Sequence, residues 1–244
     1  MPRFFVEVAY KGTHYAGFQI QANANTIQAE IEKAFHIYFR QKFELTGSSR
    51  TDAGVHALQN FFHFDTNENI ENIPIEASYH LNAILPKDIV VKSIFKVDSN
   101  AHCRFDAVSR SYEYTLYQSK DPFLEDTACY YPYPLSVDLL NEAALIIKSN
   151  TDFQSFSKKN TQVKTFDCAI MESSWAFDGN KIRYQVKGNR FLRGMVKGLV
   201  GTMLKVATGK ISIVDFEAII KDHAVSKVDF SMPPQGLVLV RVCY

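Results

Sequence analysis

The side chains best able to do chemistry cluster in residues 46–57, TGSSRTDAGVHA. This segment holds Arg50, Asp52 and His56 among small residues and Gly54. Small residues let a ligand approach the backbone closely, and a cation two positions from Asp52 favours an ionised carboxylate if the two side chains meet. The segment therefore predicts a carboxylate site. It also fits an ordinary turn, in which the aspartate only satisfies nearby backbone donors.

Other reactive residues are sparse. A lone His56 before a strand fits a hydrogen-bonded structural residue as well as a catalytic base, and no second histidine stands at metal-ligand spacing. The four cysteines are scattered singly, so the sequence predicts no metal site and buried thiols. The motifs GxxxxGK[ST], GxGxxG and GxSxG are absent. Nucleotide hydrolysis, dinucleotide chemistry and serine-elbow hydrolysis therefore lose their usual sequence support.

Charge is unevenly distributed along the chain. Residues 158–210 contain eleven Lys and Arg against three acids, a balance of +8, whereas the whole chain carries a net charge of +1. The rest of the chain must then sum to −7. This asymmetry is typical of a protein with one face for phosphates, and it also fits a solvated basic face.

Length and composition describe a folded chain. With 244 residues, 46% of them hydrophobic and 22% charged, the protein can bury a substantial core, which argues against disorder and repeats. No stretch approaches 18 apolar residues, and the N-terminus lacks the apolar segment of a signal peptide. We therefore expect a soluble, cytoplasmic protein that does not contact membranes.

The elements that must position these residues follow a repeated order. Hydrophobic periods and turn residues predict β-α-β-β-α-β in the first half of the chain, and the same order recurs in the second half. The first series comprises residues 4–10, 27–40, 43–46, 58–64, 75–85 and 89–97. The second comprises residues 110–117, a helix capped by Ser136, 166–177, 181–188, a long helix through 192–203, a short helix at 214–221, and 237–243.

This order predicts an α+β fold of two ferredoxin-like units, each an antiparallel sheet with helices on one face. We expect residues 1–105 to form the unit with the catalytic loop. Residues 106–244 are expected to form a second unit that contains the basic helix. A cleft between the units is the expected active site. Many unrelated functions share this topology, so the fold alone does not decide the function.

Seven segments together resemble the TruA family of tRNA pseudouridine synthases, in that family's order and over nearly the whole chain. They are YKGTHYAGFQIQ (10–21), SSRTDAGVHA (48–57), LNAILPKDI (81–89), AHCRFDAVSRSYEYTLY (101–117), DFQSFS (152–157), FLRGMVKGLVGTML (191–204) and PPQGLVLVRVCY (233–244). The resemblance implies a homodimer that isomerises uridine to pseudouridine in the tRNA anticodon stem-loop, at positions 38 to 40, without a cofactor.

The resemblance also implies roles for single residues. The catalytic aspartate of the family falls on Asp52, and the arginine two positions before it falls on Arg50. Tyr112 matches a tyrosine that lies against the flipped base, and Leu237 matches an apolar residue of the uracil pocket. Lys197 stands where relatives often carry an arginine that pairs with the carboxylate. Without the resemblance, Leu237 would fit core packing equally well, and packing would be the better interpretation of Tyr112. With it, Tyr112 stacks on the base or, as an alternative, transfers a proton.

Spacing adds two further candidates. Arg190, Arg193 and Lys197 follow i, i+3 and i+7, which predicts three cations on one face near a helix N-terminus, where phosphates bind favourably.

Two departures from the family pattern are Ser49 in place of a glycine and Phe18 in place of a tryptophan. Both keep a plausible size or apolarity.

The mechanism and two rival functions stay open. Asp52 can attack C1′, attack the base, or stabilise a cationic sugar and remove a proton on the way to a glycal. One rival is an RNA-binding protein that has lost turnover. The other is a hydrolase of small substrates, although a glycosidase would use a second carboxylate and this reading leaves the basic helix unexplained.

Overall fold

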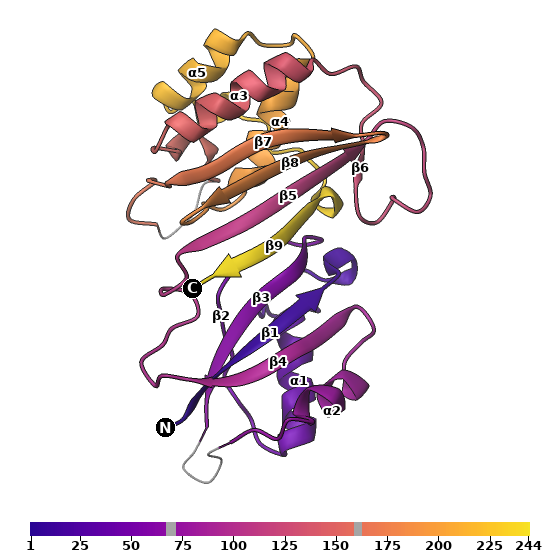
Figure 1. The fold of residues 1–244 in the computed structure, drawn as a ribbon, viewed down its shortest axis with the longest axis vertical. Coiled ribbons are helices and arrows are strands. Elements are labelled where there is room, and N and C mark those ends of the chain that lie inside the picture. Colours follow the sequence, from indigo (N-terminus) through magenta and orange to yellow (C-terminus); the bar gives the residue numbers. More distant parts are fainter. Residues whose placement is uncertain (67–71, 159–162) are drawn as a thin grey trace. The chain divides into compact units, whose positions relative to one another are not determined.

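A computed structural model describes residues 1–66, 72–158 and 163–244. The chain divides into two compact units, the first made of Met1–Val108 and Val238–Tyr244, and the second of Ser109–Leu237. Both units combine strands and helices, which confirms the predicted mixture of α and β structure (Figure 1). No helix within the described ranges is both long enough and apolar enough to span a lipid bilayer.

The first unit is built on a mainly antiparallel sheet. In chain order its elements are β1 (Arg3–Tyr10), η1 (Gly12–His14), α1 (Ile27–Phe39), β2 (Thr46–Gly47), β3 (His56–Asp65), α2 (Ala77–Ile84), β4 (Ile89–Val97) and β9 (Leu237–Cys243). β1 lies between β3 and β4 and is antiparallel to both. β2 pairs antiparallel with β3, and β9 pairs parallel with it.

The core of this unit lies between the sheet and its helices. Alternate residues of β1, such as Phe4, Val6 and Val8, are buried, as expected for a strand with one face packed on helices. Thr26 begins α1 by accepting a hydrogen bond from the backbone N–H of Ala29 at 3.3 Å. The apolar face of α1 then reaches the sheet, because the ring centroids of Phe35 and Phe64 lie 5.3 Å apart, edge to face.

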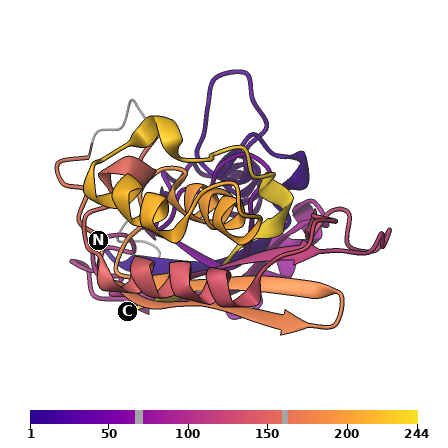
Figure 2. The ribbon, with the colours of Figure 1, turned by 90° about the horizontal axis from the view of Figure 1, so that it is seen from above.

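The second unit has β8 at the centre of its sheet. Its elements are β5 (Ser109–Tyr117), β6 (Cys129–Tyr130), α3 (Val137–Ser149), η2 (Gln154–Phe156), β7 (Ile170–Asp178), β8 (Lys181–Gly188), α4 (Met195–Ala207), α5 (Ile213–Lys221), η3 (Val225–Lys227) and η4 (Pro234–Gly236). β8 is antiparallel to β5 and β7, and β6 runs parallel to β5. The helices α3, α4 and α5 pack against one another (Figure 2).

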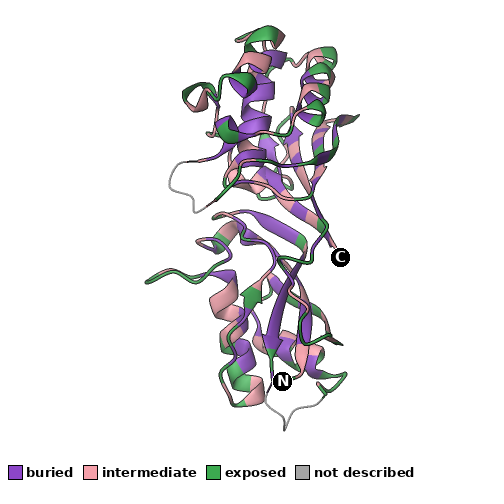
Figure 3. Cartoon of the chain, turned by 90° about the vertical axis from the view of Figure 1, so that its left-hand side faces the viewer, coloured by how far each residue is buried: buried purple, intermediate pink, exposed green. Residues whose placement is uncertain are grey.

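Helix α4 is the buried centre of the second unit. All of its residues are buried except Lys197 and Lys205, which are partly exposed. Figure 3 shows the burial of the described residues. Two glycines let residues 228–232 pack closely on the helix. A Cβ on Gly198 would lie 2.9 Å from the ring of Phe230, and one on Gly201 would collide with the carbonyl oxygen of Asp229. The helix is therefore a core element with a narrow polar margin.

Most predicted elements match the structure, and several boundaries differ. The predicted strands 89–97, 181–188 and 237–243 match β4, β8 and β9 at both ends. The short strand predicted at 43–46 is present as β2 but begins only at Thr46, because Phe43 and Leu45 are core residues of an irregular segment. Three elements begin later than predicted: α2 at Ala77, β7 at Ile170 and α4 at Met195.

The last strand differs from the predicted grouping. The repeat places residues 237–243 in the second unit, whereas the structure groups Val238–Tyr244 with the first. There β9 pairs with β3, with His56 opposite Val238 and Ala57 opposite Leu239. The Val242 N–H also donates to Oε1 of Gln59 at 3.1 Å. Strand pairing joins residues far apart in the chain, so a linear repeat does not reveal it.

Candidate functional site

Asp52 begins a tight turn just before β3. The Val55 N–H donates to the Asp52 carbonyl oxygen at 3.2 Å, and Gly54 at the third position has a φ of +76°. Glycine adopts this left-handed conformation without the steric cost of a Cβ. The turn expected from the sequence is thus present, and it presents the Asp52 side chain at the end of a buried strand.

The segment after β1 holds this turn from one side. The Phe18 N–H donates to the Thr51 carbonyl oxygen at 3.1 Å, and the Gly54 N–H donates to the Tyr15 carbonyl oxygen at 3.3 Å. A Cβ on Gly17 would lie 3.1 Å from the Thr51 carbonyl oxygen, so the two backbones are in close contact. The backbone of Asp52 is therefore fixed by its neighbours on both sides.

Side chains beneath the turn add a second set of contacts. The hydroxyls of Tyr10 and Thr51 lie 2.8 Å apart, and Asn60 Nδ2 donates to Tyr10 at 3.2 Å and to the Ser49 carbonyl oxygen at 2.9 Å. Tyr15 donates its hydroxyl to Asp88 at 2.7 Å, and burial followed by this carboxylate raises the pKa of Tyr15. These tyrosines and Asn60 are site residues that the sequence analysis missed, although Tyr10 and Tyr15 lie inside one of its motifs.

The Asp52 carboxylate itself is partly exposed. Within the described parts of the chain it forms no hydrogen bond or ion pair. Arg50 is exposed and forms no ion pair with Asp52 in the same ranges, so the anticipated contact between these two side chains is not made. Asp52 is therefore a fixed but unpartnered carboxylate, which suits a group that must act on a substrate.

His56 has a structural role. Its Nδ1 accepts a hydrogen bond from the Gly12 N–H at 2.9 Å, and its side chain is buried. Because Nδ1 accepts, the neutral ring carries its hydrogen on Nε2. This agrees with the structural alternative that the sequence left open for this histidine.

A small polar pocket adjoins Arg50 within the first unit. It has a volume of about 200 Å³, and Asp52 is not among its lining residues. Its lining includes the polar or exposed side chains of Gln19, Arg50, His102, Arg104 and Phe105. His102, Arg104 and Phe105 lie inside one of the family segments, at positions for which the sequence pattern predicts no role.

In the second unit, Tyr112 lies on β5 opposite Val186 of β8. It shares its face of the strand with Tyr114 and Leu116, which are buried, whereas Tyr112 is partly exposed. The ring of Phe191 meets it edge to face, with centroids 5.1 Å apart and an interplanar angle of 83°. Phe191 thus orients the tyrosine, a contact that only the folded chain reveals.

Leu237 follows a turn that is packed against the same strand. Tyr114 donates its hydroxyl to the Pro233 carbonyl oxygen at 2.7 Å, and a Cβ on Gly236 would lie 2.7 Å from the Tyr114 ring. Leu237 is 7% exposed, so the core interpretation stays compatible with it. The turn that carries Leu237 is therefore anchored two residues along the strand from Tyr112.

The predicted placement of the cations on one helix is wrong in part. Helix α4 begins at Met195 after Gly194, whose φ is +75°, so Arg190 and Arg193 precede the helix and only Lys197 lies on it. Arg193 is exposed, and Arg190 is partly exposed with Nη1 3.4 Å from the Thr165 hydroxyl. The left-handed glycine interrupts the helical spacing that the sequence pattern implied.

Several cations of the basic segment pair with acids. Arg183 contacts Asp178 at 2.8 Å, Lys187 contacts Glu172 at 3.2 Å, and Lys205 contacts Asp229 at 3.8 Å. Lys159, which the charge count includes, lies outside the described residues. The balance of +8 already subtracts Asp178 and Glu172, so of these pairs only that of Lys205 with Asp229, which lies outside the segment, offsets further charge.

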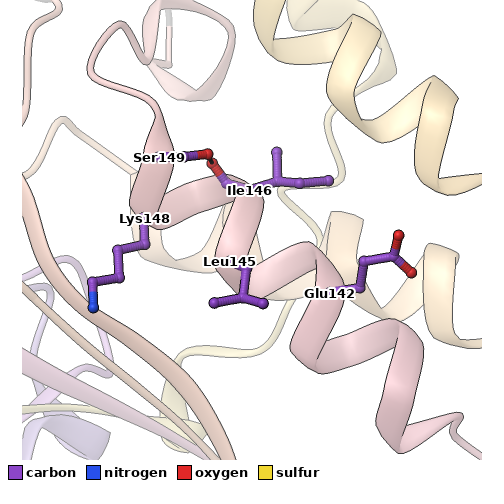
Figure 4. Close-up of a pocket in the computed structure, with 5 residues that line it drawn as sticks. All are labelled: Glu142, Leu145, Ile146, Lys148 and Ser149. Atoms are coloured by element: carbon purple, nitrogen blue, oxygen red, sulfur yellow. Dashed lines mark hydrogen bonds between the residues drawn. The ribbon is translucent and has the colours of Figure 1, made fainter.

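A second hollow lies along α3. Glu142, Leu145, Ile146, Lys148 and Ser149 line it, all on this one helix (Figure 4). The Ser149 hydroxyl donates back to the Ile146 carbonyl oxygen at 3.0 Å. None of the predicted site residues belongs to it, and it offers no converging polar groups.

Comparison with known proteins places the chain in a family. A family model described as tRNA pseudouridine synthase matches residues 7–106 and 150–244. The chain belongs to the tRNA pseudouridine synthase family. Family membership confirms the prediction made from the seven segments, and with it the predicted enzyme class, an isomerase.

Individual relatives match over almost their full length. A tRNA pseudouridine synthase A from Porphyromonas gingivalis is 41% identical over 247 residues, covering 100% of this chain and 98% of the relative. The protein of the same name from Parabacteroides distasonis is 40% identical and covers 100% and 96%. One from Staphylococcus aureus is 35% identical and covers 98% and 90%.

Proposed function

We propose that this protein converts uridine to pseudouridine in the anticodon stem-loop of tRNA, at positions 38 to 40, with Asp52 as its one catalytic carboxylate. The observation that carries the proposal is the Asp52 turn, whose backbone is fixed by Phe18 and Tyr15 while its carboxylate has no partner in the described chain. The family and the names of the relatives support the choice of tRNA.

The reaction is an isomerisation, so all atoms of the uridine are kept. The N1–C1′ bond breaks, the uracil turns, and a C5–C1′ bond forms; C5 then loses its proton and N1 gains one. Asp52 attacks C1′, attacks the base, or stabilises the sugar cation and takes a proton from it. A rigid turn serves each of these routes, because the carboxylate must stay aligned while the base moves.

The target uridine must leave the helical stack to reach a carboxylate. We assign Tyr112 to stack on the flipped base, with Phe191 holding the tyrosine ring by its edge-to-face contact at 5.1 Å. We assign Leu237 to the apolar wall of the uracil pocket. Arg50, exposed beside the turn, holds the flipped nucleotide or the space that it leaves.

Lys197 is assigned to support the charge of Asp52, and Arg190 and Arg193 to bind RNA phosphates. Lys197 is one of only two residues of α4 that are not buried, so it is a charged residue of this helix that solvent and ligands can reach. A lysine keeps the positive charge of the arginine in relatives and lacks its two-pronged geometry.

Three further features belong to the proposal. We infer a homodimer in the cytoplasm, in which tRNA bound at one active site also contacts the partner subunit. We also infer that each unit is ferredoxin-like, with helices on one face of an antiparallel sheet. Light scattering of the purified protein tests the dimer, since it gives the mass in solution directly.

The reaction is tested by tritium release from tRNA transcripts labelled at uridine C5, because pseudouridine formation expels that hydrogen. We expect release by the wild type and a loss of at least about 1,000-fold in Asp52→Asn, since the carboxylate acts on the reacting atoms. Asp98→Asn, at an exposed aspartate in the same unit, is the matched control and should retain wild-type release.

Binding separates the rival functions. Asp52→Asn should bind tRNA as tightly as the wild type, because the substitution keeps the size of the side chain. If the wild type binds tRNA and releases no tritium from any transcript, the protein is an RNA-binding protein without turnover, and the proposed reaction is wrong.

A further inference from the structure

The pocket beside Arg50 offers hydrogen-bond donors and no acid. Arg50 and Arg104 both line it, and both side chains are exposed. No Asp or Glu is among its lining residues. Guanidinium groups have five donors and no acceptor, so two of them at one small pocket favour an anion with several oxygens.

His102 adds a third donor to this pocket. Its Nδ1 accepts hydrogen bonds from the backbone N–H groups of Arg104 at 3.1 Å and Phe105 at 3.4 Å. The neutral ring therefore carries its hydrogen on Nε2, which makes that nitrogen a donor. Gln19 also lines the pocket, and its exposed amide supplies a further hydrogen-bond donor.

The segment that carries these groups is held rigidly. The His102 N–H donates to Asp106 at 2.7 Å, the Cys103 thiol donates to the Thr46 carbonyl oxygen at 3.0 Å, and His63 Nδ1 lies 3.1 Å from Cys103 Sγ. Tyr244 donates its hydroxyl to the Cys103 carbonyl oxygen at 2.7 Å. A preorganised set of donors binds an anion without an ordering cost at the moment of binding.

Three residues of this segment and its surroundings could also hold a metal ion. His63, His102 and Cys103 each offer a ligand atom, and these atoms lie within 4.8 Å of one another. Several of their ligand atoms already have partners, since His102 Nδ1 accepts two N–H groups, the Cys103 thiol donates to a carbonyl, and His63 Nδ1 lies 3.1 Å from Cys103 Sγ. We therefore assign His63 and Cys103 to positioning Arg104 and Phe105, and His102 both to positioning them and to donating from Nε2.

Phe105 identifies the kind of anion. Its ring is 74% exposed, and the Arg104 guanidinium lies over it at 5.7 Å from the centroid. An exposed aromatic ring beside a cation is the pairing that single-stranded nucleic acids use, with the ring stacking on a base and the cation on the neighbouring phosphate. A small anion would make no use of the ring.

We propose that this pocket binds a backbone phosphate of the substrate RNA next to the target uridine, between Arg50 and Arg104, while Phe105 stacks on the base of an adjacent nucleotide. The inference rests on the proposed function, because Arg50 stands two residues before Asp52. It adds Arg104 and Phe105 to the substrate-binding residues, with His102 as a further donor.

The test uses equilibrium binding to an anticodon stem-loop RNA in an Asp52→Asn background, so it does not depend on turnover. Arg104→Ala should weaken binding about tenfold and reduce the slope of log K against log salt by about 1, the value for one lost phosphate contact. Phe105→Leu should weaken binding about tenfold through lost stacking and leave the salt slope unchanged.

Matched controls are available at exposed positions. Arg241→Ala changes an arginine of β9 in the same unit, and Phe123→Leu changes a phenylalanine of the second unit that is 91% exposed. Both controls should leave affinity and salt slope at the wild-type values. Since the altered side chains are all exposed, each variant should keep the wild-type thermal midpoint, which is measured in parallel.

RNA chemistry identifies the phosphate. Single phosphates beside the target uridine are replaced by uncharged methylphosphonates. At one RNA position the replacement should weaken binding about tenfold in the protein that retains Arg104, and it should cause no further loss of affinity in Arg104→Ala. Competition by inorganic phosphate tests whether the pocket instead binds a free anion. If inorganic phosphate competes in an Arg104-dependent way while no methylphosphonate has an effect, the pocket is a free-anion site and the proposal is wrong.

Two more outcomes would overturn the proposal. One is an Arg104→Ala variant that binds RNA as tightly as Arg241→Ala, with the same salt slope. The other is a full additional loss when Arg104→Ala and the methylphosphonate are combined, because independent effects mean that the arginine and that phosphate do not meet. Absence of tritium release from the wild type would instead refute the proposed reaction and leave these binding results unaffected.

Discussion

The Asp52 turn and the start of α4 carry the two kinds of charge that the proposed reaction uses, and they are built in different ways. The turn is held by backbone hydrogen bonds from Phe18 and Gly54 and by the hydroxyl of Tyr10. The cations Arg190 and Arg193 instead project from an irregular segment that ends at a left-handed Gly194.

The difference follows from what each charge must do. A carboxylate that acts on C1′ or on the base must be placed within a fraction of an ångström, so its backbone is fixed and its side chain is short. A cation that meets phosphates gains from a long side chain, because electrostatic attraction tolerates many geometries. Small backbone changes near Asp52 should therefore cost turnover, whereas changes at the cations should alter affinity and its dependence on salt.

The strongest test of this contrast changes a buried glycine in each region. Gly12→Ala places a Cβ against the Val55 carbonyl oxygen, and neither backbone can move freely. We expect a loss of about 4 kcal/mol in the free energy of unfolding, together with a fall in kcat of the folded fraction. Denaturant unfolding and tritium release measure the two effects.

Gly201→Ala provides the comparison in α4, where a Cβ would meet the Asp229 carbonyl oxygen. It should lower stability as well, with kcat per folded molecule near that of the wild type, because the Asp52 turn is untouched. Gly179→Ala meets nothing within 4 Å and should cost about 1 kcal/mol through its φ of +55° alone. Equal losses of kcat in the Gly12 and Gly201 variants would refute the contrast.

Low pH should destabilise the first unit, because the unfolded chain binds a proton at His63 more readily than the folded chain does. Burial, together with the charges of Arg3 and His102, lowers the pKa of His63 to about 4. The unfolded chain binds the proton near pH 6.5, so stability is full above that value and falls by up to about 3 kcal/mol as the pH drops from 6.5 to 4. Hydrogen exchange should show β3 opening before β8.

The matched variants for this prediction are His63→Gln and His36→Gln. His36 is exposed on α1, so its substitution should leave the pH dependence of unfolding unchanged. His63→Gln lowers stability by a constant amount and should flatten the curve between pH 4 and 6.5. A steep curve in His63→Gln would show that other groups carry the acid sensitivity.

Removing one hydroxyl beneath the turn is a smaller change. Tyr10→Phe leaves the buried Thr51 hydroxyl without the partner that now lies 2.8 Å away. We expect a loss of about 1.5 kcal/mol in stability and a fall in kcat with KM unchanged, since Thr51 directly precedes Asp52. Tyr38→Phe, on a ring that stacks on His80 at 5.6 Å, is the control and should change neither quantity. A rise in KM alone would contradict a positioning role for Tyr10.

Much of the fold was predictable because local patterns and tertiary packing agree. The strands β4, β8 and β9 alternate or contain β-branched residues between clear turns, and Ser136 caps α3 as expected. The predicted boundaries are wrong where an apolar spacing continues beyond the residue at which the helix or strand begins or ends in the folded chain. Leu192 continues the apolar spacing of α4 towards the N-terminus, but Gly194 in the left-handed conformation precedes the helix, which therefore begins only at Met195.

The candidate site was only partly predictable, for a related reason. Asp52 and its turn are encoded in consecutive residues, so a sequence pattern finds them. The partners of that turn are Tyr10, Tyr15 and Asn60, and the partner of Tyr112 is Phe191. Each of these contacts joins distant parts of the chain. Periodicity carries no information about them, although most of these residues lie inside the quoted segments.

The smallest predicted effect concerns single cations of the basic segment. Arg193 is exposed with no ion pair in the described ranges, whereas Arg183 pairs with Asp178 at 2.8 Å. Arg193→Ala should raise KM for tRNA about fivefold, reduce the salt slope of binding by about 1 and leave kcat unchanged. Arg183→Ala removes a charge that an acid already offsets, so its KM and salt slope should stay near the wild type. If both variants lose affinity equally, phosphate binding depends on the net charge of the segment, and the distinction between paired and exposed cations does not hold.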